Sequence, residues 1–145
     1  MIKIICLGSI KENYLKQAIN DYQTRLSKYT KLQIIELKDE YSLKKEKDNI
    51  LKHIHKKDNI ILLDIKGKQM TSEDFSSFIN KELTLNSNIT FIIGSSNGVD
   101  EEIKNLTDKK ISFSQLTFPH GLFRLILLEQ IYRSFKIINN ETYHK

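Results

Sequence analysis

The sequence is poor in the residues that mark secreted and membrane proteins. Among its 145 residues there is one cysteine, one proline and no tryptophan. The lone Cys6 has no partner for an intramolecular disulfide, and its apolar surroundings favour burial. No apolar run approaches the roughly 20 residues of a transmembrane helix, and no signal peptide is recognisable. We therefore expect a cytoplasmic protein with a single domain over residues 1–145.

The chain is rich in charge, with a formal net charge of +5 and an isoelectric point of about 9.2. A basic balance favours an anionic partner such as nucleic acid, although lysine-rich proteins reach it without one. The lysine-rich segment 39–57 is more typical of a solvated helix face than of a binding site. His53 and His55 within it would point to different faces of a helix, so we expect no metal site there.

Strand-like and helix-like segments alternate along the chain. Apolar runs that favour strands cover residues 1–7, 32–37, 59–65, 88–93 and 110–113. Helical spacing lies between them, at residues 11–29, 39–57, 71–83, 100–106 and from 119 onward. The runs 59–65 and 88–93 do not alternate with polar residues, which is typical of parallel strands buried on both faces. This order predicts an α/β fold with three layers and a mostly parallel sheet.

Three loops of such a fold could carry a ligand, because ligands bind beyond the carboxyl ends of parallel strands. These loops follow Asp64, Ile93 and Phe113. None has the glycine pattern of a dinucleotide-binding or P-loop motif. The loop 94–98 leads into three acidic residues, 100–102, which would repel a phosphate at the start of a helix. The loop therefore favours a neutral or cationic ligand, with an ordinary strand-to-helix turn as the alternative.

The last helix is expected to begin at Pro119 and carries a broad apolar arc. Arg124 falls near the centre of this arc, where an unpaired charge would be strongly unfavourable. A buried structural ion pair, a place at a dimer seam and a contact to a bound ligand all remain open for it. The arc is wide enough to serve both a core and a homodimer interface.

A combination of motifs is more specific than any single loop. The chain ends in Tyr143-His144-Lys145, after a segment that reads Phe113-Ser114-x-x-Thr117-Phe118-Pro119-His120 and helix residues Arg124, Leu128 and Glu129-Gln130-Ile131-Tyr132-Arg133. The same set includes Met1 to Gly8, Leu63-Asp64-x-x-Gly67-Lys68 and Ile93-Gly94-Ser95-Ser96-Asn97-Gly98. Together these motifs span the chain and closely resemble the small bacterial ribosomal RNA large subunit methyltransferase H family of the SPOUT superfamily.

The resemblance implies an α/β fold with a deep C-terminal trefoil knot, a homodimer, and S-adenosylmethionine as methyl donor. The implied reaction is methylation of N3 of a pseudouridine in the 23S rRNA of the large ribosomal subunit. A ribosome- or RNA-binding homodimer with the same fold and no catalytic activity is the alternative.

The resemblance also implies that backbone from three loops holds the donor. The residues carried over are Leu63, Gly94, Phe113, Ser114, Gln115, Leu116, Thr117 and Phe118. They lie on the loops that the strand ends also select. The donor is a sulfonium cation, which agrees with acidic residues rather than lysines beside loop 94–98. The chain departs from the family at Ser95, where a second glycine is common.

The C-terminal residues are expected to act on the acceptor. As N3 loses its proton, Arg133 would stabilise the developing negative charge and His144 would take the proton. Tyr143 and Lys145 are expected to bind RNA. In the alternative interpretation, Arg133 and Lys145 only bind phosphate and positioning alone carries the rate.

Overall fold

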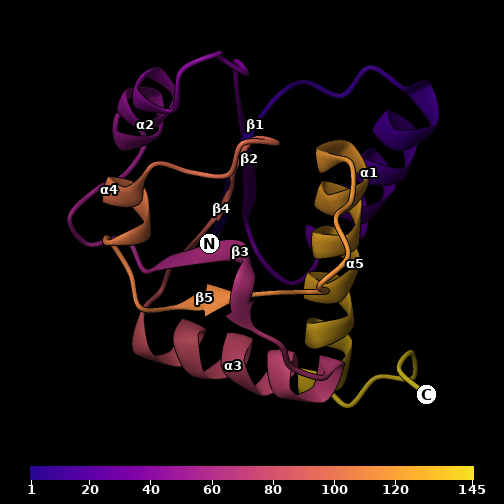
Figure 1. Cartoon of the computed structure of the whole chain (residues 1–145). Helices are drawn as coiled ribbons and strands as arrows, with labels where there is room; N and C mark the ends of the chain where they lie inside the picture. The colour runs from indigo at the N-terminus through magenta and orange to yellow at the C-terminus, as the bar shows by residue number, and fades with distance from the viewer.

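Figure 1 shows the computed structural model, which describes residues 1–145 as five strands and five helices in alternation. The strands are β1 (Ile2–Leu7), β2 (Leu32–Leu37), β3 (Ile60–Lys68), β4 (Ile89–Ile93) and β5 (Lys110–Ile111). The helices are α1 (Asn13–Leu26), α2 (Leu43–Leu51), α3 (Ser72–Leu85), α4 (Glu101–Lys104) and α5 (His120–Ile138). None of the helices combines the length and the hydropathy needed to span a bilayer.

All neighbouring strands of the single sheet run parallel, in the order β2-β1-β4-β3-β5. Of the three inner strands, β1 and β4 are buried along their whole length, because their apolar runs face helices on both sides. In the register of the sheet, Ile4 of β1 lies between Ile34 of β2 and Phe91 of β4. The predicted α/β architecture with a parallel sheet is confirmed.

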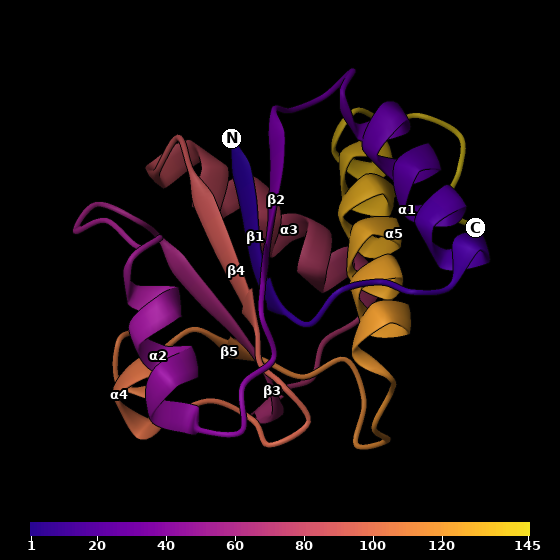
Figure 2. The same ribbon diagram turned by 90° about the horizontal axis from the view of Figure 1, so that it is seen from above.

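The two faces of the sheet carry unequal layers of helices (Figure 2). Helices α1, α3 and α5 cover one face and share a buried cluster of 20 apolar residues with it. Helices α2 and α4 cover the other face, where the cluster has only 7 residues. Because buried apolar area is the main stabilising term, the first face is the principal core and holds the longest helix, α5, in place.

Helix α5 packs against both α1 and α3, so its apolar arc is largely used within the chain. Leu127, Leu128 and Ile131 on this arc are fully buried. Replacement of such a leucine by alanine costs about 2–5 kcal/mol in other cores. The core part of the prediction for the arc is therefore confirmed.

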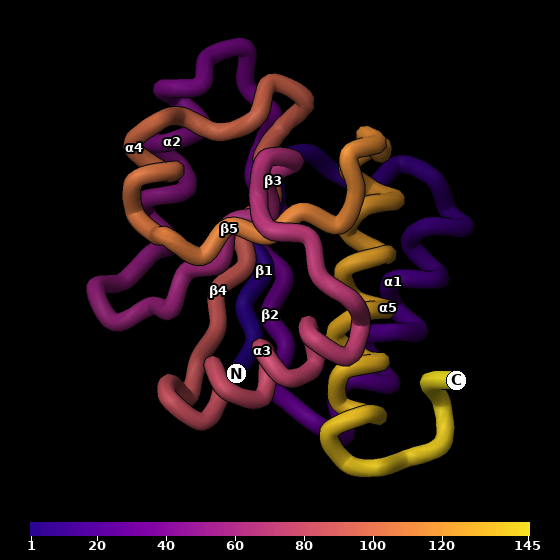
Figure 3. Tube along the Cα trace, turned by 60° about the horizontal axis from the view of Figure 1, so that its bottom comes forward, coloured from indigo at the N-terminus to yellow at the C-terminus, as the bar shows by residue number.

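Several predicted boundaries are wrong at the ends of elements. The helix predicted over 39–57 is limited to Leu43–Leu51, and the last strand to Lys110–Ile111. Strand β3 instead continues past residue 65, because both Leu63 and Lys68 pair with Ile111 and the strand bulges between them. At Gly67 a side chain would not fit, since a Cβ would lie 2.6 Å from the backbone nitrogen of Ile111. The chain beyond β5 runs beside this bend of β3 on its way to α5 (Figure 3).

Arg124 is buried and forms an ion pair with a half-exposed glutamate. It is 2% exposed, and its Nη1 lies 2.6 Å from Oε2 of Glu36 at the end of β2. Its Nη2 donates a hydrogen bond to the carbonyl of Gly8 at 3.1 Å. Of the three roles left open for Arg124, the structure shows the structural ion pair, which ties α5 to the ends of β1 and β2.

Candidate functional site

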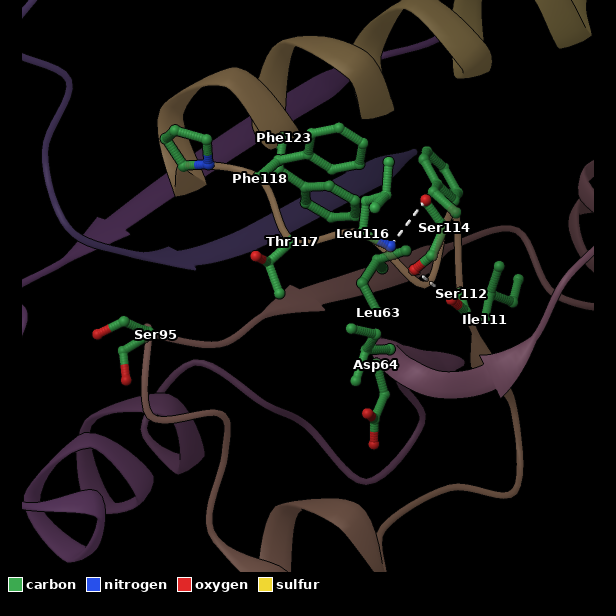
Figure 4. Close-up of a pocket in the computed structure, with 14 residues that line it drawn as sticks. Leu63, Asp64, Ser95, Ile111, Ser112, Ser114, Leu116, Thr117, Phe118 and Phe123 are labelled. Atoms are coloured by element: carbon green, nitrogen blue, oxygen red, sulfur yellow. Dashed lines mark hydrogen bonds between the residues drawn. The ribbon is translucent and has the colours of Figure 1, made fainter.

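A pocket opens at the carboxyl ends of β4 and β5 and beside the middle of β3, which lies between them in the sheet. It encloses about 560 Å³, which is within the roughly 300–1,000 Å³ typical of small-molecule sites. We call it the strand-end pocket. Its walls come from Leu63 and Asp64 within β3, Ser95 and Ser96 after β4, and the β5–α5 loop, residues 112–119. In Figure 4, Phe118 and Phe123 lie on one side of it, opposite Asp64 and Ser95.

The structure brings the three predicted loops together at this pocket. Most of the residues expected to hold the donor line it, namely Leu63, Phe113, Ser114, Leu116, Thr117 and Phe118. Gln115 is not part of the wall, and Gly94 stands directly behind the wall residue Ser95. One of the three predicted loops is wrong, because β3 continues from Asp64 to Lys68 instead of ending there. The three segments nevertheless meet at one pocket, and their binding of the donor stays a prediction.

The pocket wall is half apolar, with 7 hydrophobic residues among 14, and carries little charge. The Phe118 and Phe123 rings stack with centroids 6.4 Å apart, and Phe113 lies 5.3 Å from Phe123. Asp64 is the single charged residue of the wall, and no lysine, arginine or histidine faces the pocket. A phosphate would find no cation there, whereas a neutral or cationic ligand meets aromatic rings and one carboxylate.

The β5–α5 loop presents unused backbone groups. Its shape is held by two hydrogen bonds, from the Ser112 hydroxyl to the Ser114 carbonyl and from the Leu116 N–H to the Ser114 hydroxyl, both at 3.0 Å. The N–H groups of Ser114, Thr117 and Phe118 donate to no acceptor within the protein. Free backbone donors beside an apolar pocket are suited to the polar edge of a heterocycle.

The turn that follows β4, residues 94–98, is closely folded. The N–H of Gly98 donates to the carbonyl of Ser95 at 2.9 Å, and Gly98 has a φ of +82°. A Cβ on Gly94 would lie 2.6 Å from the carbonyl oxygen of Gly98. Glycine is therefore required at position 94 for this turn to form.

A second group of residues gathers where the C-terminus meets α5 and α3. We call it the tail cluster, and its members are Glu73, Glu129, Arg133, Tyr143 and His144. Arg133 pairs with Glu129 four residues earlier on α5 at 2.9 Å, and the Tyr143 hydroxyl donates to the same carboxylate at 3.0 Å. The guanidinium also lies 4.8 Å above the Tyr143 ring.

His144 is held on both ring nitrogens. Its Nδ1 lies 3.0 Å from Nη1 of Arg133, and its Nε2 lies 2.6 Å from Oε1 of Glu73. A guanidinium can only donate, so Nδ1 accepts and the proton sits on Nε2 and is donated to Glu73. This hydrogen bond from His144 lowers the pKa of the Glu73 carboxyl. In this conformation the basic nitrogen of His144 is occupied.

The pKa values of Arg133 and Tyr143 in the tail cluster are also shifted. The hydrogen bond from Arg133 to Glu129 raises the pKa of the guanidinium, which stays protonated. Burial, together with the nearby Tyr22 and Glu129, raises the pKa of the Tyr143 hydroxyl. Tyr143 is therefore a neutral hydrogen-bond donor at neutral pH.

The structure thus places Arg133, Tyr143 and His144 together, but none of them lines the strand-end pocket. Lys145 is exposed at the end of the chain and makes no ion pair. Sequence reasoning missed Glu73, because 71 residues separate it from His144. The contact between Glu129 and Arg133 could be predicted from the sequence, because the two residues are four apart on one helix.

A smaller hollow of about 210 Å³ lies between α3 and α5 and connects the two groups. It shares Phe113 and Phe118 with the strand-end pocket. Its polar residues are Thr71, Ser72 and Gln130. Oε1 of Gln130 accepts from Ser72 at 2.7 Å, and Nε2 of Gln130 donates to Glu129 at 2.9 Å. A hydrogen-bonded path therefore leads from this hollow to the tail cluster. Nowhere do three or more potential metal ligands of the His, Cys, Asp or Glu type come together.

Comparison with known proteins assigns the family. A family model described as "Predicted SPOUT methyltransferase" matches residues 1–144. The ribosomal RNA large subunit methyltransferase H of Caldicellulosiruptor bescii is 49% identical over 154 residues, which cover 100% of both chains. The protein of the same name from Clostridium botulinum strain Langeland is 52% identical over 157 residues, which cover 99% of each chain. The chain therefore belongs to the SPOUT methyltransferase family, whose methyl donor is S-adenosylmethionine.

Proposed function

We propose that this protein methylates N3 of a pseudouridine in the 23S rRNA of the large ribosomal subunit, with S-adenosylmethionine bound in the strand-end pocket. The observation that carries the proposal is the pocket itself, in which three loops present backbone and aromatic rings without any cation. The full-length relatives named for large-subunit rRNA methylation supply the substrate class. A ribosomal RNA substrate favours a cytoplasmic location for the protein.

The pocket residues suit the donor. The free N–H groups of Ser114, Thr117 and Phe118 match the edge of an adenine, and Phe118 and Phe123 offer a stacking surface for its ring. The donor supplies a methyl group activated by a positively charged sulfur, which the carboxylate of Asp64 and the absence of a basic wall residue accommodate. Gly94 keeps the wall behind Ser95 close-packed.

The tail cluster suits the acceptor. Attack by N3 requires loss of its proton, and an anion develops on the base as the proton leaves. As the base binds, Arg133 would move from His144 to the side of the base where the anion will develop, since both sites accept hydrogen bonds from a guanidinium. That movement frees the Nδ1 lone pair of His144, which then takes the proton. Tyr143 and Lys145 at the chain end would contact the RNA beside the base.

The acceptor base has a route to the donor through the smaller hollow. Its walls include Phe118, which also lines the strand-end pocket, and Gln130, which is hydrogen-bonded to Glu129 of the tail cluster. A base seated there would lie between the two groups of residues that the reaction needs. The proposed division of labour is donor binding by the pocket and acceptor chemistry by the tail.

The whole chain, residues 1–145, forms one SPOUT domain with a C-terminal trefoil knot in this proposal. The pairing of both Leu63 and Lys68 with Ile111 supports it, because residues 64–67 then curve around the segment that leads to the donor loop. The close approach of Gly67 to the backbone of Ile111, where a Cβ would not fit, agrees with such a crossing. Family membership supports the same topology.

A homodimer is also part of the proposal. The first turns of α1 and α5 expose the large apolar side chains Tyr14 (69% exposed) and Leu122 (37% exposed), which line a common hollow. Leu116 and Phe118 are exposed nearby in the β5–α5 loop. We expect light scattering to give twice the mass of one chain, and Leu122→Glu to shift it toward one chain. A monomeric wild-type protein would contradict this.

The function is tested by incubating the purified protein with S-adenosylmethionine and with ribosomes, large subunits or free 23S rRNA that lack the modification. Mass spectrometry of RNA fragments then locates any added methyl group. We expect one methyl group at N3 of a pseudouridine in 23S rRNA. Donor binding without methyl transfer to any of these substrates would support the RNA-binding alternative instead.

A further inference from the structure

One carboxylate in the protein is buried without a cation. Glu46 on α2 is 2% exposed, and no ion pair includes it. The other buried charged residues, Lys3, Glu82 and Arg124, each pair with an opposite charge. Because a buried carboxylate without partners is strongly disfavoured, the groups that satisfy Glu46 indicate its role.

The carboxylate of Glu46 accepts hydrogen bonds from two neutral donors. Oε1 accepts from the hydroxyl of Ser95 at 3.0 Å, and Oε2 accepts from the backbone N–H of Glu40 at 3.0 Å. Burial and the nearby Asp39 raise the pKa of the Glu46 carboxyl, and the hydrogen bonds from Glu40 and Ser95 act against this rise. The contact therefore joins α2, on the minor face of the sheet, to a wall residue of the strand-end pocket.

Ser95 organises the turn to which it belongs. Its carbonyl accepts from the N–H of Gly98 at 2.9 Å, and its hydroxyl oxygen accepts from the N–H of Asn97 at 3.3 Å. No other side-chain hydrogen bond connects residues 94–98 to a different part of the protein. The contact with Glu46 is thus the single polar anchor of this turn.

We propose that Glu46 is a positioning residue for the methyl donor. Its carboxylate fixes Ser95, and through Ser95 it sets the distance between the 94–98 turn and the β5–α5 loop across the pocket. The inference rests on the donor-site part of the proposed function and is independent of the RNA substrate. A glycine at position 95 has no hydroxyl and could not make this contact.

The test is a double-mutant cycle read out as donor affinity. Calorimetry would measure the Kd of S-adenosylmethionine for the wild-type protein, Glu46→Gln, Ser95→Ala and the double variant. We expect each single variant to bind the donor about 3–10-fold more weakly. The double variant should bind no more weakly than the worse single one, because the two side chains act through one contact.

The matched control is Glu101→Gln on α4. Its carboxylate is 80% exposed and lies in the helix that follows the same turn, so the variant removes an equal charge without touching the anchor. We expect its Kd to stay within about twofold of the wild-type value. Thermal unfolding of every variant would identify any that has lost the fold, and Ser95→Ala, which removes a single oxygen, keeps the test usable if Glu46→Gln unfolds.

A second readout separates positioning from general damage. With saturating donor, the methyl-transfer rate of the folded variants should return to the wild-type rate while KM for the donor stays raised. Donor Kd values within twofold of the wild type in both single variants, or effects that add in the double variant, would overturn the inference. If the wild-type protein binds the donor but methylates no rRNA, the proposed RNA substrate fails, and the role of Glu46 is still decided by the Kd values.

Discussion

The strand-end pocket and the tail cluster are made from different parts of the chain. The pocket is framed by backbone and apolar side chains at the ends of β4 and β5 and beside β3, and the residues on which it stands, such as Ile93 and Ile111, are buried. The tail cluster is a set of charged and polar side chains, of which Glu73 is 63% exposed. The shape of the pocket is therefore part of the fold, whereas the tail cluster depends on individual side-chain contacts.

The two regions consequently differ in how easily they rearrange. A change in the shape of the pocket would disturb the pairing of β3, β4 and β5. The close packing of the core around these strands resists such a change. Partly exposed ion pairs contribute little to stability, so the contacts of Arg133 and His144 can exchange for contacts with a substrate. The following predictions test whether the fixed strand-end pocket binds the donor while the tail cluster, whose contacts can exchange, carries out the chemistry.

The largest effect is expected from Gly94→Ala, which breaks the pocket side of the comparison. The added Cβ would lie 2.6 Å from the Gly98 carbonyl, so the 94–98 turn must open. We expect donor binding in calorimetry to weaken at least about 100-fold, equivalent to about 2.7 kcal/mol. Thr117→Ala is the control, because the proposed contact of Thr117 with the donor is through its backbone, and it should change the Kd by less than about twofold. Similar losses in both variants would argue against a backbone-built site.

Deletion of residues 143–145 should have the next largest effect, on the tail side alone. It removes Tyr143, His144 and Lys145, and with them the proposed proton acceptor. We expect the single-turnover methyl-transfer rate to fall about 100-fold or more, while the donor Kd stays within about twofold. An equal loss of donor affinity would show that the tail belongs to the donor site and would end the proposed division.

A smaller effect is expected from Glu73→Gln, which sharpens the comparison within the tail cluster. The amide can still accept a hydrogen bond from Nε2 of His144, but the charge that favours this contact is lost. We expect the methyl-transfer rate to change by less than about fivefold and the donor Kd not to change. A rate as low as that of the tail deletion would assign Glu73 a direct part in the reaction.

The smallest effect is expected on the chemical labelling of Cys6. This residue lies in β1, so its labelling measures whether the sheet stays closed. Burial raises the pKa of this thiol to about 11, so at pH 8 it is protonated as well as inaccessible. Between pH 9 and 11 the unfolded chain releases this proton before the folded one does, so the contribution of the thiol to stability falls as pH rises. We expect thiol reagents to label Cys6 at pH 8 only on unfolding, and equally slowly after the tail deletion. Faster labelling of the deleted chain would mean that the tail supports the sheet.

The sequence predicted the layers and the pocket well because both follow from local patterns. Apolar runs without alternation, such as the one in β4, indicate parallel strands, and the ends of parallel strands share one edge of the sheet. The bulge of β3 could not be predicted, because it depends on the contact between Gly67 and Ile111, which are distant in sequence.

Contacts between polar or charged residues that are far apart in the sequence could not be predicted either. Arg124 was recognised as a buried charge that needs a partner, but nothing in its own helix identified Glu36 as that partner. Glu73 and Glu46 are likewise joined to His144 and Ser95 only through the tertiary fold. Periodicity locates such residues on a face of a helix, and the fold alone decides what that face meets.

The central claim is that the strand-end pocket holds the methyl donor through backbone groups. It is tested most directly by a crystal structure of the protein with S-adenosylmethionine. The account predicts an adenine within hydrogen-bond distance of the backbone of residues 113–118, in a site bordered by Leu63 and Gly94. A donor bound elsewhere, for example in the hollow lined by Gly8, Glu36 and His120, would contradict it.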